Sequence, residues 1–156
     1  MSLDDICSSP TITNCVISNN VATCQGGGIY IDWYNSPIIK DCIIFNNSTG
    51  EYGGGILVGL HCNLLLSNCV ISDNSSLNGS GGLFIGNYSR CASIRNCTII
   101  GNFASNKGGG IQCGWSISEF ENCVIWENLA PDGAQMYFKG GSTRPCWVKI
   151  CYNNIQ

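Results

Sequence analysis

One cysteine recurs through this 156-residue chain at an almost constant interval. It stands at positions Cys15, Cys42, Cys69, Cys97 and Cys123. The gaps between them are 27, 27, 28 and 26 residues, and an asparagine or an aspartate precedes each one. A repeat this regular predicts one supersecondary unit that is stacked on copies of itself.

Other positions keep the same spacing. The residue two after the cysteine is always isoleucine, at Ile17, Ile44, Ile71, Ile99 and Ile125. The residue five after it is always asparagine, at Asn20, Asn47, Asn74, Asn102 and Asn128. A glycine-rich segment followed by apolar residues closes each unit, as at residues 26–31 and 53–58. Every unit therefore has the same internal order of short segments.

The segments between these landmarks are short β-branched runs with two-residue alternation, bounded by Gly, Asn and Ser. No segment shows a sustained helical period, so we expect almost no helix. A unit of about 27 residues with three short strands is typical of one coil of a parallel β-helix, in which coils lie about 4.8 Å apart. We predict an all-β solenoid of about five and a half coils, forming a single domain over residues 1–156. Because the last unit stops within a coil, we also expect a piece of a longer or open-ended protein.

Alternation in the second half of each unit assigns two faces. One set is expected to point inward: Ile29, Ile56, Leu83, Ile111 and Met136, with Ile31, Val58, Ile85, Cys113 and Phe138. The residues between them are expected to point outward: Tyr30, Leu57, Phe84, Gln112 and Tyr137. This arrangement predicts a partly apolar stripe on the outside of one sheet.

The charge of the chain excludes some partners. Only 11% of the residues are charged, the net charge is −3, and no run of Lys or Arg occurs. We therefore expect neither nucleic acid nor an anionic membrane surface as a partner. No stretch of 18 apolar residues is present, so no membrane insertion is expected. The start of the chain lacks the features of a signal peptide, which predicts a cytoplasmic protein if the chain is complete and a secreted or surface protein if it is part of a longer exported one.

The glycine-rich segment and the Ile-x-x-Asn motif resemble those of a known family. Here they read Gly26-Gly-Gly-Ile29 and Ile17-Ser-Asn-Asn20. They are similar to the repeats of polymorphic outer-membrane proteins and related right-handed parallel β-helix proteins, with isoleucine in place of phenylalanine. Residues 122–156 are similar to the last coils of large bacterial secreted β-helix repeat proteins. The resemblance implies a right-handed, single-stranded β-helix of the pectin-lyase-like superfamily, whose members include adhesins, surface proteins, polysaccharide lyases and pectinases. Fold does not decide among these functions.

The five repeat cysteines could be metal ligands, disulfides or core residues, and we expect core residues. One cysteine per coil gives a line, whereas zinc needs a tetrahedral set of ligands. Stacking also holds the Cβ atoms near about 4.8 Å, beyond the about 3.5–4.5 Å that a disulfide favours. Among the other cysteines, Cys62 and Cys91 lie in loops of neighbouring coils and are the best candidates for a disulfide. Neither a metal site nor a cofactor is predicted.

The asparagine column is expected to form an amide ladder. Each carboxamide of Asn20, Asn47, Asn74, Asn102 and Asn128 can donate to one neighbouring coil and accept from the other. Amides supply neither an acid nor a base, so the column predicts a structural role.

The chain shows no catalytic pair of carboxylates. Glycosidases need two Asp or Glu side chains about 5–10 Å apart. The outward position two before the repeat cysteine reads Thr13, Lys40, Ser67, Arg95 and Glu121, which contains no such pair. Arg95 and Glu121 are expected to form a surface ion pair of little energetic weight. No catalytic residue is assigned, and a non-enzymatic protein is favoured.

Aromatic residues gather in the loops that precede each coil. The candidate ligand-binding residues are Asp32, Trp33, Tyr34, His61, Tyr88 and Trp115. Rings along such a ridge could present flat faces to sugar rings, and Asp32 could bond hydroxyl groups. The alternative, which we favour, is that the rings pack on one another and cover the core.

Three functions follow from these observations. The first is a non-enzymatic scaffold with a structural or adhesive role, which binds polysaccharide or glycan along the aromatic ridge. The second is a polysaccharide-active lyase or hydrolase. The third is self-association, either through the open ends of the solenoid or through its exposed apolar stripe.

Overall fold

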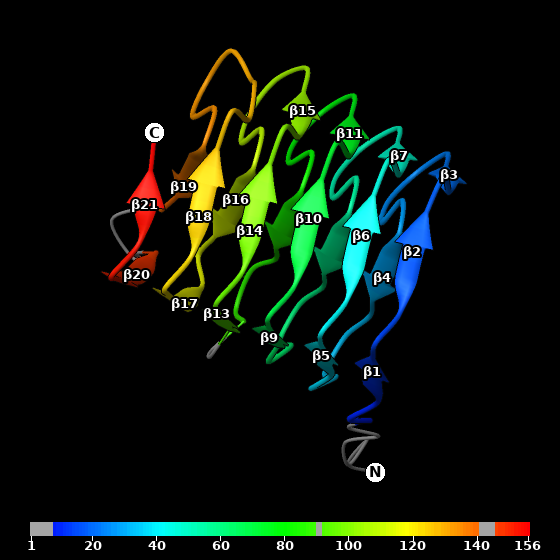
Figure 1. The fold of residues 1–156 in the computed structure, drawn as a ribbon, viewed down its shortest axis with the longest axis vertical. Helices are drawn as coiled ribbons and strands as arrows, with labels where there is room; N and C mark the ends of the chain where they lie inside the picture. The colour runs from blue at the N-terminus through cyan, green and yellow to red at the C-terminus, as the bar shows by residue number, and fades with distance from the viewer. Residues whose placement is uncertain (1–7, 90–91, 141–145) are drawn as a thin grey trace, which may run out of the picture.

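The computed structural model describes residues 8–89, 92–140 and 146–156. Short parallel strands form four sheets in this part of the chain (Figure 1). Sheet A holds β1 (Thr11–Thr13), β5 (Ile38–Lys40), β9 (Leu65–Ser67), β13 (Ala92–Arg95), β17 (Ile117–Glu121) and β20 (Trp147–Cys151). Sheet B holds β2 (Val16–Ser18), β6 (Ile43–Phe45), β10 (Val70–Ser72), β14 (Thr98–Ile100), β18 (Val124–Trp126) and β21 (Asn154–Ile155). Sheet C holds β3 (Val21–Ala22), β7 (Ser48–Thr49), β11 (Ser75–Ser76) and β15 (Phe103–Ala104). Sheet D holds β4 (Ile29–Ile31), β8 (Ile56–Val58), β12 (Leu83–Ile85), β16 (Ile111–Gly114) and β19 (Met136–Lys139).

Every strand pairs in parallel with its equivalent in the next coil. In sheet B the register runs Ile17, Ile44, Ile71, Ile99, Ile125 and Ile155. Successive coils therefore lie side by side, as the neighbouring arrows of Figure 1 show. The predicted all-β, parallel solenoid is confirmed. Within the described residues we find no helix, and so none that could cross a membrane.

The chain turns at bends where one residue takes a left-handed backbone conformation. One such column precedes the repeat cysteine, at Asn14, Asp41, Asn68, Asn96 and Asn122. A second precedes the ladder asparagine, at Asn19, Asn46, Asp73, Gly101 and Glu127. A third lies in the glycine segment, at Gly26, Gly53, Ser80, Gly108 and Gly133. Asn, Asp and Gly tolerate this conformation best, which explains why they dominate the bends.

The glycine that follows this third bend is needed for a different reason. Gly54 has no positive φ, but a Cβ there would lie 2.4 Å from the carbonyl oxygen of Gly81 and 2.4 Å from that of Ser75. The next coil therefore approaches the bare backbone, and no larger residue fits at this position.

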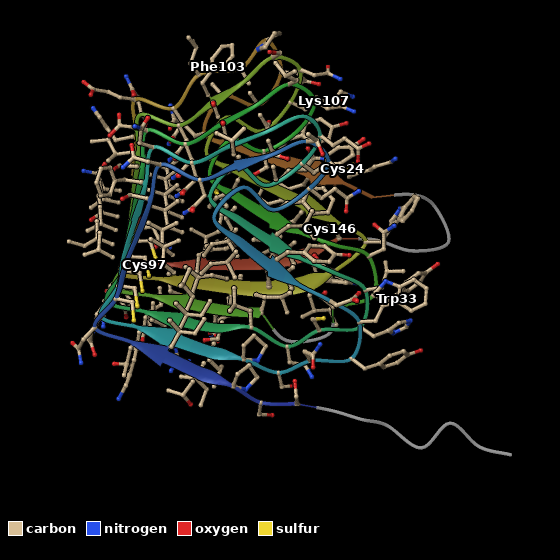
Figure 2. The ribbon with its side chains drawn as sticks, turned by 90° about the vertical axis from the view of Figure 1, so that its right-hand side faces the viewer. Cys24, Trp33, Cys97, Phe103, Lys107 and Cys146 are labelled. Carbon is tan, nitrogen blue, oxygen red and sulfur yellow. The ribbon has the colours of Figure 1, made fainter. Side chains whose placement is uncertain are left out.

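The core is a set of columns inside the coils. The largest fully buried side chains include Phe120, Ile44, Ile71 and Ile99. Figure 2 looks along the stack and shows the sulfur atoms gathered near Cys97 inside one corner, whereas Trp33 projects outside on the opposite side. Each coil thus buries its apolar face only by stacking on its neighbours.

An amide ladder runs through the solenoid beside sheet B. The Nδ2 of Asn47 donates to Oδ1 of Asn74 at 3.0 Å, and the Nδ2 of Asn74 donates to Oδ1 of Asn102 at 3.0 Å. The same geometry joins Asn20 to Asn47 and Asn102 to Asn128, at 2.9 Å in each case. Each Oδ1 also accepts the backbone N–H of the preceding member. The ladder therefore links five coils, and its amides are buried in all but the first of them.

Amide side chains close the C-terminal end of these columns. Gln135, seven residues after Asn128, accepts the Nδ2 of Asn128 at 2.8 Å and so takes the place of a further ladder asparagine. Asn153 stands at the repeat-cysteine position and accepts the backbone N–H of Cys123 at 2.7 Å. These groups satisfy donors that would otherwise face the open end of the last coil.

The expected exposure of the outward stripe is wrong at two positions. Leu57 and Gln112 keep the predicted register with Phe84, yet they are only 3% and 7% exposed. Both line hollows on the outside of sheet D, where neighbouring bends contribute further side chains. Phe138 keeps the predicted inward register with Cys113, and it is 40% exposed because β19 is the edge strand of sheet D.

Candidate functional site

Three of the loop aromatics form a ring stack. The Tyr34 and His61 ring centroids lie 4.9 Å apart with an interplanar angle of 2°. The His61 and Tyr88 centroids lie 5.1 Å apart at 11°. Because both faces of His61 and one face of each tyrosine are turned toward a neighbouring ring, this is the geometry of rings that pack on one another.

These aromatics stand at a fourth left-handed bend of the coil. The φ angles of Tyr34, His61, Tyr88 and Trp115 are 59°, 59°, 63° and 37°. An aromatic residue is less suited to this conformation than Asn or Gly, and a strained backbone of this kind costs on the order of 1–3 kcal/mol. Each stacked ring pair contributes about 0.5–1.5 kcal/mol of stabilisation, which offsets much of this cost. Side-chain packing therefore explains why aromatic residues stand at this bend. Trp115 is covered by a cation, with the Lys139 Nζ 5.1 Å from its ring centroid.

Trp33 stands apart from the stack. Its side chain is 57% exposed, and its backbone N–H donates to Oδ1 of Asp32 at 2.8 Å. The Asp32 carboxylate is exposed and lies close to the phenol of Tyr30. Burial, and then the Asp32 charge, raise the pKa of Tyr30. The structure therefore brings Asp32 and Trp33 together with Tyr30 on the outside of sheet D.

A hollow of about 270 Å³ opens beside Trp33. Its aromatic lining consists of Tyr30, Trp33, Tyr52 and Phe84. Leu57, Gly59 and Gly86 also line it. The rings of Tyr52 and Phe84 are in contact, with centroids 5.1 Å apart and a tilt of 45°. We call this the Trp33 hollow.

A second hollow of about 180 Å³ shares Tyr52 with the first and is polar. Its lining includes Asn78, Gly79, Lys107, Gln112, Tyr137 and Lys139. The Nζ of Lys107 lies 3.0 Å from the Tyr137 hydroxyl and 4.6 Å from the centre of its ring. The Asn78 Nδ2 donates to the Tyr52 hydroxyl at 3.1 Å. We call this the Lys107 hollow, and the two together the outer groove.

Gln112 carries an unsatisfied acceptor in the Lys107 hollow. Its side-chain oxygen Oε1 is buried and has no hydrogen-bond donor. The amide fits because Gly79 leaves space, since a Cβ there would lie 2.3 Å from this oxygen. A buried acceptor without a donor is costly, so a hydroxyl or amine that enters the hollow and bonds Oε1 would gain that energy.

Sequence reasoning missed one column that builds the groove. The residue before the third bend reads Gln25, Tyr52, Gly79, Lys107 and Asp132, and isolated bridges join the last four. This position varies from coil to coil, whereas the neighbouring glycines recur. Aligning the coils on their glycines would have shown it beside the outward stripe.

The repeat cysteines lie in a buried column, except at its start. Cys42, Cys69, Cys97 and Cys123 are each 1% exposed, and Cys15 in the first coil is exposed. Hydrogen bonds with Cys123 and Cys69 and burial raise the pKa of Cys97. The bond to Cys97 lowers the pKa of Cys69 and of Cys123 to about 7. Access of a reagent, rather than ionisation, therefore controls the reactivity of this column.

Cys62 is fully buried and has no disulfide partner among the described residues, and its Sγ donates to the backbone oxygen of Asp32 at 2.7 Å. Burial raises the pKa of Cys62. Cys91, its predicted disulfide partner, lies outside the described residues. The Cys62–Cys91 disulfide stays a prediction.

Thiol labelling should separate these classes. In the native protein, Cys15 and Cys24 are expected to react rapidly with iodoacetamide, because both are exposed. Cys42, Cys97 and Cys123 are expected to react only after unfolding. Peptide mapping by mass spectrometry, with and without urea, measures each site. Rapid native labelling of Cys97 would show that the column is open to solvent.

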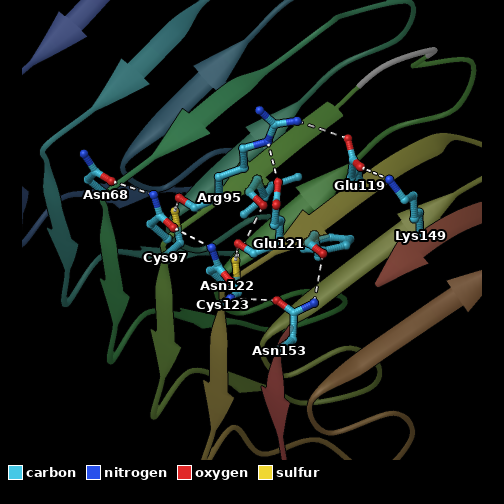
Figure 3. Close-up of polar contacts among 12 residues, drawn as sticks. Asn68, Arg95, Cys97, Glu119, Glu121, Asn122, Cys123, Lys149 and Asn153 are labelled. Atoms are coloured by element: carbon cyan, nitrogen blue, oxygen red, sulfur yellow. Dashed lines mark hydrogen bonds and ion pairs between the residues drawn. The ribbon is translucent and has the colours of Figure 1, made fainter. Parts of the chain in front are cut away.

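The charged residues of sheet A form a surface network rather than a site (Figure 3). Arg95 pairs with Glu119 at 3.4 Å and with Glu121 at 3.2 Å, and Lys149 bonds Glu119. The pKa of Glu119 is lowered mainly by Lys149 and to a lesser extent by Arg95. Arg95 and Lys149 are exposed and the two glutamates are half-buried at the surface, so the pairs contribute little to stability. In the described ranges, no three His, Cys, Asp or Glu side chains are placed to hold a metal ion.

Comparison with known proteins identifies one family. The family model described as a right handed beta helix region matches residues 2–125, most of the chain. Comparisons with curated proteins and with solved structures gave no match.

Proposed function

This chain belongs to the family of right-handed β-helix regions, and from that premise we propose that it is a non-catalytic repeat scaffold whose outer groove binds glycan. The observation that carries the proposal is the Trp33 hollow, where four aromatic side chains line an open space on the outside of sheet D. Sugar-binding sites combine such apolar faces with a few placed polar groups.

The Lys107 hollow supplies the polar groups. Gln112 offers an acceptor without a donor, and Asn78 donates to the hydroxyl of Tyr52, the residue that lines both hollows. Neither hollow is lined by a carboxylate in the part of the chain that the structure describes. A groove whose described lining holds no pair of carboxylates supports binding rather than hydrolysis.

The groove replaces the loop ridge as the proposed surface. Both faces of His61, and one face each of Tyr34 and Tyr88, are covered by a neighbouring ring, so the stack offers little aromatic face to a ligand. Trp33 is the loop aromatic whose side chain both lines a hollow and stays largely exposed. We propose that an oligosaccharide lies along sheet D, from Trp33 toward Lys107.

Replacement of Trp33 or Phe84 by alanine tests this function. An oligosaccharide panel screened by isothermal titration calorimetry should identify a ligand whose affinity falls about tenfold in either variant, equivalent to about 1.4 kcal/mol. Trp147→Ala is the matched control, because Trp147 is 66% exposed on sheet A and should leave the affinity unchanged. Binding that survives Trp33→Ala and Phe84→Ala together would refute the groove as the site.

A further inference from the structure

We propose that the Trp33 hollow takes an alkylammonium group, so that the glycan preferred by the outer groove carries an amino sugar with a free amine at its Trp33 end, away from Lys107 and Lys139. The class of ligand rests on the proposed glycan-binding function. The ammonium subsite itself is argued separately, from the shape, the rings and the charges of the hollow.

The repeat sets the width of the hollow. Tyr30 and Phe84 stand at the same register two coils apart, with Leu57 between them. Their backbones are therefore about 9.6 Å apart, twice the interstrand spacing. Leu57 is 3% exposed and forms a floor, while Trp33 and Tyr52 complete the walls. The space is one small group wide and is bounded by aromatic side chains.

The charges beside the hollow are negative. The Asp32 carboxylate accepts a hydrogen bond from the Trp33 backbone N–H, and its charge raises the pKa of Tyr30. The Glu51 carboxylate accepts the side-chain amide of Gln25, a further lining residue, at 2.9 Å. No Lys or Arg of the described residues lines the Trp33 hollow. Aromatic faces with nearby carboxylates attract a cation and repel an anionic group.

The same side of the solenoid already holds ammonium groups on rings. Lys107 lies over Tyr137 and Lys139 lies over Trp115. These two lysines line the neighbouring hollow, where the chain supplies its own cations. The Trp33 hollow has the aromatic surface without such a cation. An ammonium group of the ligand fits there by the same chemistry.

Three probes test the proposal with the whole chain: a β-1,4-linked glucosamine tetramer, its fully N-acetylated counterpart, and tetramethylammonium chloride. Below the pKa of the sugar amines, we expect the glucosamine tetramer to bind at least about fivefold more tightly than the acetylated one. Tetramethylammonium should compete with the glucosamine tetramer. It should also change the tryptophan fluorescence contributed by Trp33, and this change should be absent in Trp33→Ala. Asp32→Asn should reduce the preference, and Asp73→Asn, an exposed carboxylate at another bend, should keep it.

The outcomes separate the two proposals. Equal binding of both tetramers, weakened by Trp33→Ala, would overturn the ammonium subsite and leave glycan binding in place. Binding of tetramethylammonium at Trp33 without binding of any oligosaccharide would support the subsite and refute the glycan function. Absence of binding by all three probes would overturn the ammonium subsite, and if the oligosaccharide panel also failed, the glycan function with it.

Discussion

Replacing Asn74 with alanine is expected to lower the free energy of unfolding by about 3–5 kcal/mol. Asn74 is fully buried, and its Oδ1 accepts both the backbone N–H and the Nδ2 of Asn47. Its Nδ2 donates to the backbone oxygen of Ile44 and to Oδ1 of Asn102. Alanine removes the acceptor of the Asn47 backbone N–H and the side-chain donor to the Ile44 oxygen, whereas Asn102 Oδ1 keeps the backbone N–H of residue 74. Each buried group left without a partner costs about 1–3 kcal/mol.

Urea denaturation followed by circular dichroism measures this effect. Asn20→Ala is the matched control, because Asn20 is exposed at the start of the ladder and should lose less than about 1 kcal/mol. If Asn74→Ala unfolded at nearly the same urea concentration as the unaltered protein, the ladder would not contribute to stability.

Phe120→Ala is expected to have a similar effect for a different reason. Phe120 is 0% exposed and lies between Ile94 and Ile150 in the register of sheet A. Removing a buried phenylalanine side chain leaves a cavity and costs about 3–5 kcal/mol. Phe120→Leu keeps most of the volume and should cost less than about 1.5 kcal/mol. Equal stability of the two variants in the same denaturation assay would contradict a tightly packed core at this coil.

The spacing of cysteines and asparagines was enough to predict the architecture, because each coil needs these residues at the same positions. A small buried side chain suits the column of Cys42 and Cys97, and a carboxamide suits a ladder such as Asn47 to Asn74. Each constraint acts at every coil, so the repetition is visible in a single sequence. The same alternation also placed Tyr30 and Phe84 correctly on the outer face of sheet D.

The groove could not be predicted, because it depends on residues that do not repeat. Tyr52 and Lys107 occupy one column that reads glycine at position 79. Their side chains, and not the register, decide that Leu57 and Gln112 are buried. The ring stack posed a related difficulty, because a shared register of Tyr34 and His61 does not say whether the rings face each other or the solvent. Contacts between coils settle such questions, and a linear sequence does not record them.

We propose that the outer groove of sheet D is the ligand-binding surface. The most direct test is a titration of the protein with an oligosaccharide that the calorimetric screen identifies. Carbon–proton NMR spectra of the aromatic side chains are recorded at each step. The largest shifts are expected at Tyr30, Trp33, Tyr52 and Phe84, which line the groove. Shifts confined to Tyr34, His61 and Tyr88, or to Phe45 and Trp126 on sheet B, would contradict it.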